Sequence, residues 1–197
     1  MRLKSKAFTL IEVLLAASLM ALVGLAVFRS FANGLKLWAR ADQLTREAEV
    51  AIFFDKMAED LRSVPHISGI DFKGTSGKVA FPAIVLTKAD SHSSRFPEGL
   101  IDQIGAVEYR FDAQTHTVFR RQANYSYALK KKWEQEKAVV TGIDGVDFYY
   151  EIPTLKALVM KSEINGVAPL GVLLKIHFTD HNGQHQFQRY LSIPVSG

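Results

Sequence analysis

Cysteine is absent from this sequence of 197 residues. Its absence excludes disulfide bonds, thiolate-bound metal sites and cysteine nucleophiles. It leaves the compartment open, because exported proteins also occur without cysteine. The composition, with 48% hydrophobic and 22% charged residues, is that of a globular protein able to bury a core.

Outside the first six residues the chain also has almost no net charge. The formal net charge is +4, and Arg2, Lys4 and Lys6 supply three of the 24 basic side chains. The other 21 stand against 20 acidic side chains, which leaves an excess of +1. A nucleic-acid-binding domain keeps a clustered basic excess in its folded part, so we expect no nucleic acid among the partners.

Motifs of catalysis are missing as well. The sequence has no nucleophile elbow, phosphate-binding loop, metalloprotease motif or dinucleotide fingerprint. We therefore expect no catalytic residue, no cofactor and no metal, and an enzyme is the least favoured class of protein.

Two groups of side chains could still be proposed as metal ligands. One group consists of histidines that recur every four residues: His177, His181 and His185. The turn signal Asp180–Gly183 predicts that they scatter around a hairpin instead of aligning on a helix. The other group is acidic: Asp144, Asp147 and Glu151. Calcium needs a denser loop of oxygen ligands, and a turn at Asp144-Gly145 explains this segment more simply.

A basic leader and a long apolar run open the chain. The run extends from Phe8 to Phe28 and holds one charged residue, Glu12. As a helix it would span roughly 30 Å, the thickness of the hydrocarbon core of a bilayer. The positive charges before it predict that the N-terminus stays inside, so the residues after Phe28 would lie on the outer side of the membrane.

A secretory signal peptide is the alternative interpretation of this run. Its apolar region would be shorter, about 7–15 residues, and Gly24 and Ala26 would supply the cleavage site. A carboxylate within a membrane segment costs about 2.5–3.5 kcal/mol on insertion scales. A signal peptide gains nothing from that cost, so the run favours a lasting membrane anchor.

The order of residues around Glu12 carries a specific resemblance. One segment resembles the prepilin processing motif of type IV pilins and type II secretion pseudopilins: Lys6-Ala7-Phe8-Thr9-Leu10-Ile11-Glu12-Val13-Leu14. The resemblance implies that a membrane aspartyl peptidase cuts between Ala7 and Phe8 and methylates the new N-terminus. The family usually has Gly before the cut, and Ala7 is the nearest substitute in size.

Glu12 then has an expected role in assembly. Cleavage leaves a positive amine on Phe8, and methylation keeps that charge. Unpaired charges are costly in an apolar helix bundle. Glu12 of one subunit would therefore pair with the Phe8 amine of a neighbour and set the axial register between packed helices. In the alternative interpretation Glu12 only lies near the membrane interface.

The apolar run continues into an amphipathic pattern. A stripe recurs at steps of three or four: Leu37, Ala41, Leu44, Ala48, Ala51, Phe54, Ala58 and Leu61. No proline occurs before Pro65, so a single helix is predicted. The predicted divisions are a leader at 1–7, a helix at 8–63 (transmembrane at 8–28, amphipathic at 29–63) and a β-rich globular domain at 66–197.

The predicted fold class is α+β, with seven or eight antiparallel strands behind the helix. Val79–Leu86 contains Pro82 and is expected to be an edge or broken strand. Turn signals predict three hairpins, which join Val107–Phe111 to Thr117–Arg121, Val139–Ile143 to Val146–Ile152, and Val172–Thr179 to His185–Pro194.

Short pieces near the end of the helix and in the domain resemble the J-type minor pseudopilins of type II secretion: Glu59–Arg62, Val107–Asp112, Phe119–Arg121 and Ser192–Pro194. The resemblance implies two packed sheets in the periplasm, a single-pass anchor in the bacterial inner membrane, and a place in the tip complex that starts pseudopilus assembly. The implied partners are the I-type and K-type minor pseudopilins, the G-type major pseudopilin, the prepilin peptidase and the inner-membrane assembly platform.

Two other functions stay open from the sequence. A minor pilin of a type IV pilus or competence system shares the same layout. A membrane-anchored periplasmic binding domain that never polymerises would keep its leader.

One further motif is a basic run beside an aromatic residue, Lys130-Lys131-Lys132-Trp133. It could contact lipid headgroups, phosphates or an acidic partner. The favoured interpretation is a solvated loop between strands.

Overall fold

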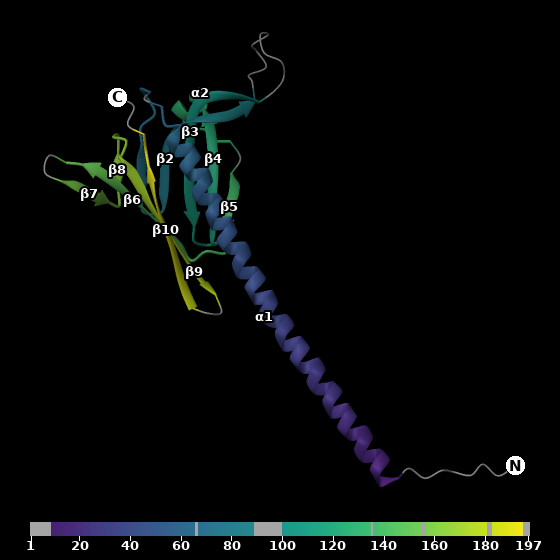
Figure 1. The fold of residues 1–197 in the computed structure, drawn as a ribbon. Coiled ribbons are helices and arrows are strands. Elements are labelled where there is room, and N and C mark those ends of the chain that lie inside the picture. The colour runs from purple at the N-terminus through teal and green to yellow at the C-terminus, as the bar shows by residue number, and fades with distance from the viewer. Residues whose placement is uncertain are drawn as a thin grey trace. The chain divides into compact units, whose positions relative to one another are not determined.

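The computed structural model describes residues 9–65, 67–88, 100–134, 136–154, 157–180 and 183–194 (Figure 1). The contacts divide the chain into two compact units, Met1–Glu47 and Ala48–Gly197. Helix α1 (Leu10–Arg62) begins in the first unit and ends in the second. The described part of the first unit consists of this helix and Thr9 before it.

Helix α1 is long because little in its sequence interrupts it. It contains two glycines, Gly24 and Gly34, and no proline. At its C-terminus the backbone N–H and the hydroxyl of Ser63 both donate to the carbonyl of Asp60. Pro65 follows two residues later, and a proline disfavours helical geometry in the residue before it.

The end of α1 packs its larger apolar side chains into the second unit. The buried ones are Val50, Phe53, Phe54, Met57, Ala58 and Leu61. The predicted stripe is right for Phe54, Ala58 and Leu61 and wrong for Ala48 and Ala51, which are exposed. Burying Val, Phe and Met removes more apolar area from water than burying Ala, so the helix turns these side chains inward.

Six of the described strands form the first sheet of the second unit, in the order β5-β4-β3-β2-β1-β8. In that order their bounds are Lys137–Thr141, Thr117–Asn124, Leu100–Asp112, Lys78–Lys88, Lys73–Thr75 and Ile164–Asn165. Every adjacent pair is antiparallel. The β3–β4 pairing places Asp112 opposite Thr117, which confirms the first predicted hairpin.

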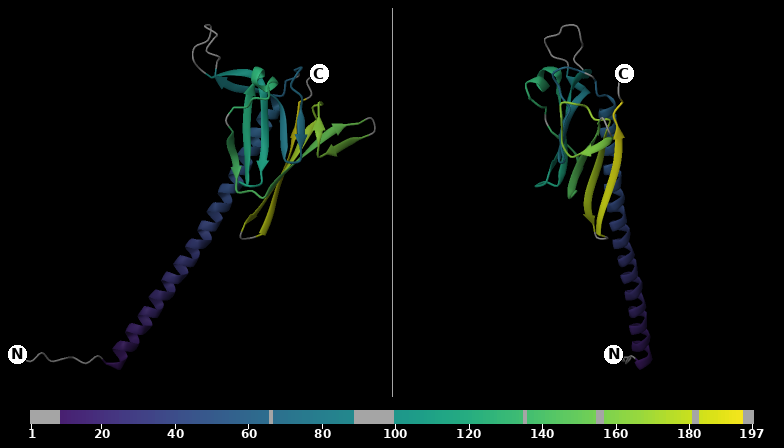
Figure 2. Two further views of the ribbon diagram at one scale, coloured as in Figure 1. Left: turned by 180° about the vertical axis from the view of Figure 1, so that it is seen from behind. Right: turned by 90° about the vertical axis from the view of Figure 1, so that its left-hand side faces the viewer.

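The other four described strands form the second sheet, in the order β10-β9-β6-β7. Their bounds are Gly183–Ser192, Gly171–Asp180, Gly145–Pro153 and Leu158–Lys161. Asp180 stands opposite Gly183 in the β9–β10 pair, which confirms the third predicted hairpin. The α+β class with two antiparallel sheets is confirmed, and Figure 2 shows both sheets from two sides.

The predicted hairpin around Asp144-Gly145 is wrong. Strand β5 pairs with β4 in the first sheet, whereas β6 pairs with β9 in the second. The chain therefore crosses between the sheets here, through Gly142 with a φ of 68° and the buried Ile143. Burial of the Ile143 side chain in the core stabilises this crossing, and a local turn signal contains no information about it.

Strand β2 runs unbroken through Pro82, contrary to part of its prediction. Pro82 stands opposite Ala106 of β3 within a continuous ladder. On its other side β2 pairs with β1 only as far as Ala80, so Pro82 lies where β2 has no described neighbour. A sheet tolerates proline at such an edge. The predicted edge position is confirmed, and the predicted break in the strand is wrong.

Aromatic side chains connect the helix with the first sheet, and the first sheet with the second. Phe53 of α1 meets Tyr109 of β3 edge to face, with 5.6 Å between the ring centroids. Phe72 stacks on Phe81 of β2 at 5.5 Å and meets Tyr150 of β6 at 6.0 Å. Buried rings of this size dominate the hydrophobic stabilisation of a core.

Candidate functional site

Glu12 lies in the first turn of α1, three residues after Thr9. The backbone N–H and the hydroxyl of Thr9 both donate to the Glu12 carboxylate, at 3.0 Å each. In return the Glu12 N–H donates to the Thr9 Oγ1 at 3.4 Å. This reciprocal arrangement is a capping box, and it satisfies donors that the first turn of a helix leaves open.

The helix cap at Thr9 was not predicted from the sequence. Its signal was present, because Thr9-Leu10-Ile11-Glu12 has the spacing of a capping box before an apolar run. The two predicted processing residues, Ala7 and Phe8, lie outside the described residues.

The described chain contains one helical segment that is long and apolar enough to cross a membrane, Leu10–Trp38. None of its most apolar stretch is buried inside the protein. An exposed apolar surface of this length is suited to a bilayer or to the helices of other chains. The segment is therefore compatible with a membrane anchor that carries Glu12 near one end.

The first part of this segment, together with the residues before it, also matches a known motif. Residues 2–28 match the prokaryotic N-terminal methylation motif. The motif spans Ala7, Phe8 and Glu12 and supports a type IV pilin-like protein. No curated protein matches the chain. The J-type resemblance rests on residues beyond 28 and stays a prediction.

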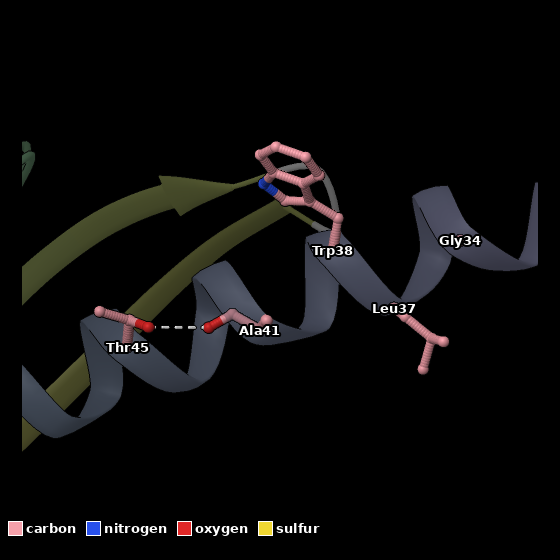
Figure 3. A pocket seen from close by; sticks show the side chains of 5 residues that line it. All are labelled: Gly34, Leu37, Trp38, Ala41 and Thr45. Carbon is pink, nitrogen blue, oxygen red and sulfur yellow. Dashed lines mark hydrogen bonds between the residues drawn. The ribbon is translucent and has the colours of Figure 1, made fainter.

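An open depression lies on α1 beyond the methylation motif, within the first unit. It is lined by Gly34, Leu37, Trp38, Ala41 and Thr45. The Thr45 hydroxyl donates to the Ala41 carbonyl at 2.9 Å, as Figure 3 shows. Because that hydroxyl is already bonded and the other lining residues lack reactive groups, the depression offers a packing surface and no catalytic group.

In the second unit a buried polar cluster joins α1 to the β3–β4 hairpin. Arg120 donates to the Asp60 carboxylate from Nε at 2.8 Å and from Nη2 at 3.2 Å. The Tyr109 hydroxyl donates to the same carboxylate at 2.6 Å. Asp60 is 4% exposed, so its charge depends on these partners instead of water.

The same cluster shifts the pKa values of its two donors. Burial, followed by the charge and hydrogen bond of Asp60, raises the pKa of Tyr109 above its usual range. Burial lowers the pKa of Arg120, but the hydrogen bonds and charge of Asp60 outweigh it and leave that pKa raised. Both groups therefore keep their protons at any physiological pH, and the cluster acts as a fixed structural link.

A second carboxylate, Glu108, is also buried in the first sheet. It is 3% exposed and lies 2.7 Å from Nη2 of Arg121 and 3.0 Å from Nζ of Lys78. Arg121 also contacts Glu136, which binds Arg110 at 2.9 Å. The buried Glu108 carboxylate therefore lies between two basic side chains, and this pairing offsets the cost of burying its charge.

The three acidic residues that could be proposed as calcium ligands each contact a different side chain of the protein. Asp144 accepts a hydrogen bond from Thr179 at 2.7 Å, and Asp147 lies 3.1 Å from Nε2 of His177. Glu151 accepts from the Tyr190 hydroxyl, a bond that raises the pKa of Tyr190 to about 12. No three such side chains are grouped to hold a metal anywhere in the described residues.

The three histidines that the structure describes likewise have separate neighbours. His177 lies on the β9 strand beside Asp147, and His185 on β10 stacks on Phe178 at 5.1 Å between ring centroids. His116 is exposed, and its Nδ1 lies 3.0 Å from the Ile143 carbonyl. His66, His92 and His181 lie outside the described residues.

Proposed function

We propose that the chain is a J-type minor pseudopilin, a structural subunit in the tip of a type II secretion pseudopilus. The methylation motif at residues 2–28 carries the pilin-like part of this proposal. Pilin-like proteins with such a motif are structural subunits and not enzymes. The exposed apolar helix and the β-rich second unit support the same architecture.

The proposed sequence of events begins with the peptidase. It removes residues 1–7 and leaves a methylated amine on Phe8. In the structure the Glu12 carboxylate is bonded to Thr9 of its own chain. We expect the Phe8 amine of a neighbouring subunit to take the remaining acceptor sites of this carboxylate, which can accept several hydrogen bonds at once. That pair would fix the axial register of the subunits.

The buried cluster supports the J-type part of the proposal. Asp60, Tyr109 and Arg120 come from three separate pieces of sequence that resemble J-type subunits, and the structure joins them in one cluster. The resemblance therefore falls on residues that fix α1 against the first sheet. The I-type, K-type and G-type pseudopilins, the peptidase and the inner-membrane platform are the proposed partners.

The first test is the intact mass of the chain extracted from the membranes of its own host. We expect a chain that begins at Phe8 and carries one added methyl group. An Ala7→Gly variant restores the residue usual in the family and should be processed at least as completely. A chain that begins at Met1 would make the protein a plain anchor, and a chain that begins near Val27 would make it a secreted domain.

A second measurement separates secretion from a pilus. Deletion of the gene that encodes this chain should stop export of folded proteins across the outer membrane and leave surface pili intact. The opposite result would favour a minor pilin of a type IV pilus or competence system.

A further inference from the structure

The basic run Lys130–Lys132 has no part in the proposed function, and it forms a closed turn with the helix before it. Helix α2 (Tyr125–Leu129) precedes the run. The N–H of Lys131 donates to the Ala128 carbonyl at 3.0 Å, and the N–H of Lys132 donates to the Tyr127 carbonyl at 2.9 Å. Residues 125–132, called here the α2 turn, therefore have a defined backbone.

Contacts on both sides fix the α2 turn to the second unit. Before it, the Asn124 side chain caps α2 by accepting the Tyr127 N–H at 2.9 Å. The Tyr125 hydroxyl donates to the Ser68 carbonyl at 3.2 Å. After it, the Trp133 ring lies 4.9 Å from the Arg121 guanidinium carbon. The turn does not need to become ordered when it binds a partner, so binding costs less conformational entropy.

The α2 turn presents apolar and basic side chains together. Its apolar members are partly open to solvent, with Tyr125 38%, Tyr127 46% and Leu129 48% exposed. Lys130, Lys131 and Lys132 are all exposed, and none forms an ion pair within the part of the chain that the structure describes. The turn itself contains no acidic residue.

We propose that the α2 turn binds the surface of a bilayer that contains anionic lipids. Tyr and Leu can enter the headgroup region, and lysine can place its charged end among the phosphates. Lysine is a compact point charge without the planar fork that favours bidentate binding of a carboxylate, which argues against an acidic protein segment. Three charges also form too small a footprint for nucleic acid. The proposal does not depend on the pseudopilin assignment.

The expected binding is weak and sensitive to salt. One lysine near an anionic membrane surface increases binding by about fivefold. Three lysines together then account for a factor on the order of 100. Salt should reduce this factor, because the charges at the surface are screened over about 8 Å at physiological ionic strength.

The test uses the full chain anchored in nanodiscs of phosphatidylcholine. These discs hold the membrane segment but offer no anionic lipid, so added vesicles are the only anionic surface. We expect the discs to bind vesicles rich in phosphatidylglycerol and not vesicles of phosphatidylcholine alone. The K130A/K131A/K132A variant should lose binding by a factor on the order of 100. A Y127S/L129S variant should bind more weakly with the same salt dependence.

The matched control is K73A/K137A/K161A, which removes the same charge from exposed strand positions and should bind as the parent does. Equal binding to both kinds of vesicle, or full binding by the K130A/K131A/K132A variant, would overturn the proposal. Failure to bind vesicles, combined with lysine-dependent binding of a polyglutamate peptide, would also overturn it and would assign the turn to an acidic protein. Inorganic phosphate at matched ionic strength should not displace the vesicles.

Discussion

At the scale of single residues, the Asp60 cluster explains how the end of α1 is fixed in the second unit. Asp60 lies on the last turn of the helix, and its two donors lie on neighbouring strands of the first sheet. A carboxylate with this burial is satisfied only when both strands and the helix are in place. The cluster therefore specifies one position of the helix against the hairpin.

Substitution of Asp60 by Ala should destabilise the protein strongly. It leaves Arg120, which is 14% exposed, without its charged partner, and breaking a buried pair in this way costs about 3–5 kcal/mol. Tyr109→Phe removes a single donor and should cost about 1–2 kcal/mol. Denaturant unfolding of the full chain in detergent micelles measures both effects.

Asp55 supplies the control for this prediction. It pairs with Arg189 at 2.6 Å on the surface, and exposed pairs contribute at most about 1 kcal/mol. If Asp60→Ala lowered the free energy of unfolding no more than Asp55→Ala does, the cluster would have no special role in stability.

At the scale of elements, strand β3 depends on the absence of a side chain at Gly105. A Cβ there would lie 2.1 Å from the Ala123 carbonyl oxygen and 2.6 Å from Cγ2 of Val85. Gly105→Ala should therefore push β3 away from its neighbours and lower the free energy of unfolding by roughly 1–3 kcal/mol. Gly77→Ala is the control, because a Cβ at Gly77 meets no atom within 4 Å. Equal unfolding midpoints for the two variants would contradict the prediction.

The elements that could be predicted from the sequence are those that local patterns determine. The β3–β4 and β9–β10 hairpins have alternating strands and a polar turn between them, and both form as predicted. The crossing from β5 to β6 depends on Ile143 entering a core made by distant strands. Helix α2 has five residues, too few to show a helical period in the sequence. The partners of Asp60 could not be predicted from the sequence, because contacts across 49 and 60 residues leave no local pattern.

At the scale of the whole molecule, the decisive residue is Glu12, because it belongs both to the helix cap and to the proposed contact with another subunit. The capping box needs only a hydrogen-bond acceptor, and Gln serves there as well as Glu. Pairing with the Phe8 amine of a neighbour needs a negative charge. The two roles can therefore be separated by a single substitution.

Glu12→Gln should leave membrane insertion, processing and the helix intact but abolish assembly and protein export. It leaves the methylated amine of the neighbour without a charged partner in an apolar bundle, a loss of several kcal/mol per contact. Thr9→Val is the matched control, because it removes the hydroxyl from the capping box and keeps the Glu12 carboxylate. It should assemble and export as the parent does. The chain has no cysteine, so one introduced cysteine on the exposed face of α1 can report contact between subunits by cross-linking. Normal cross-linking and export in Glu12→Gln would show that Glu12 serves the helix cap and that another group sets the register of the filament.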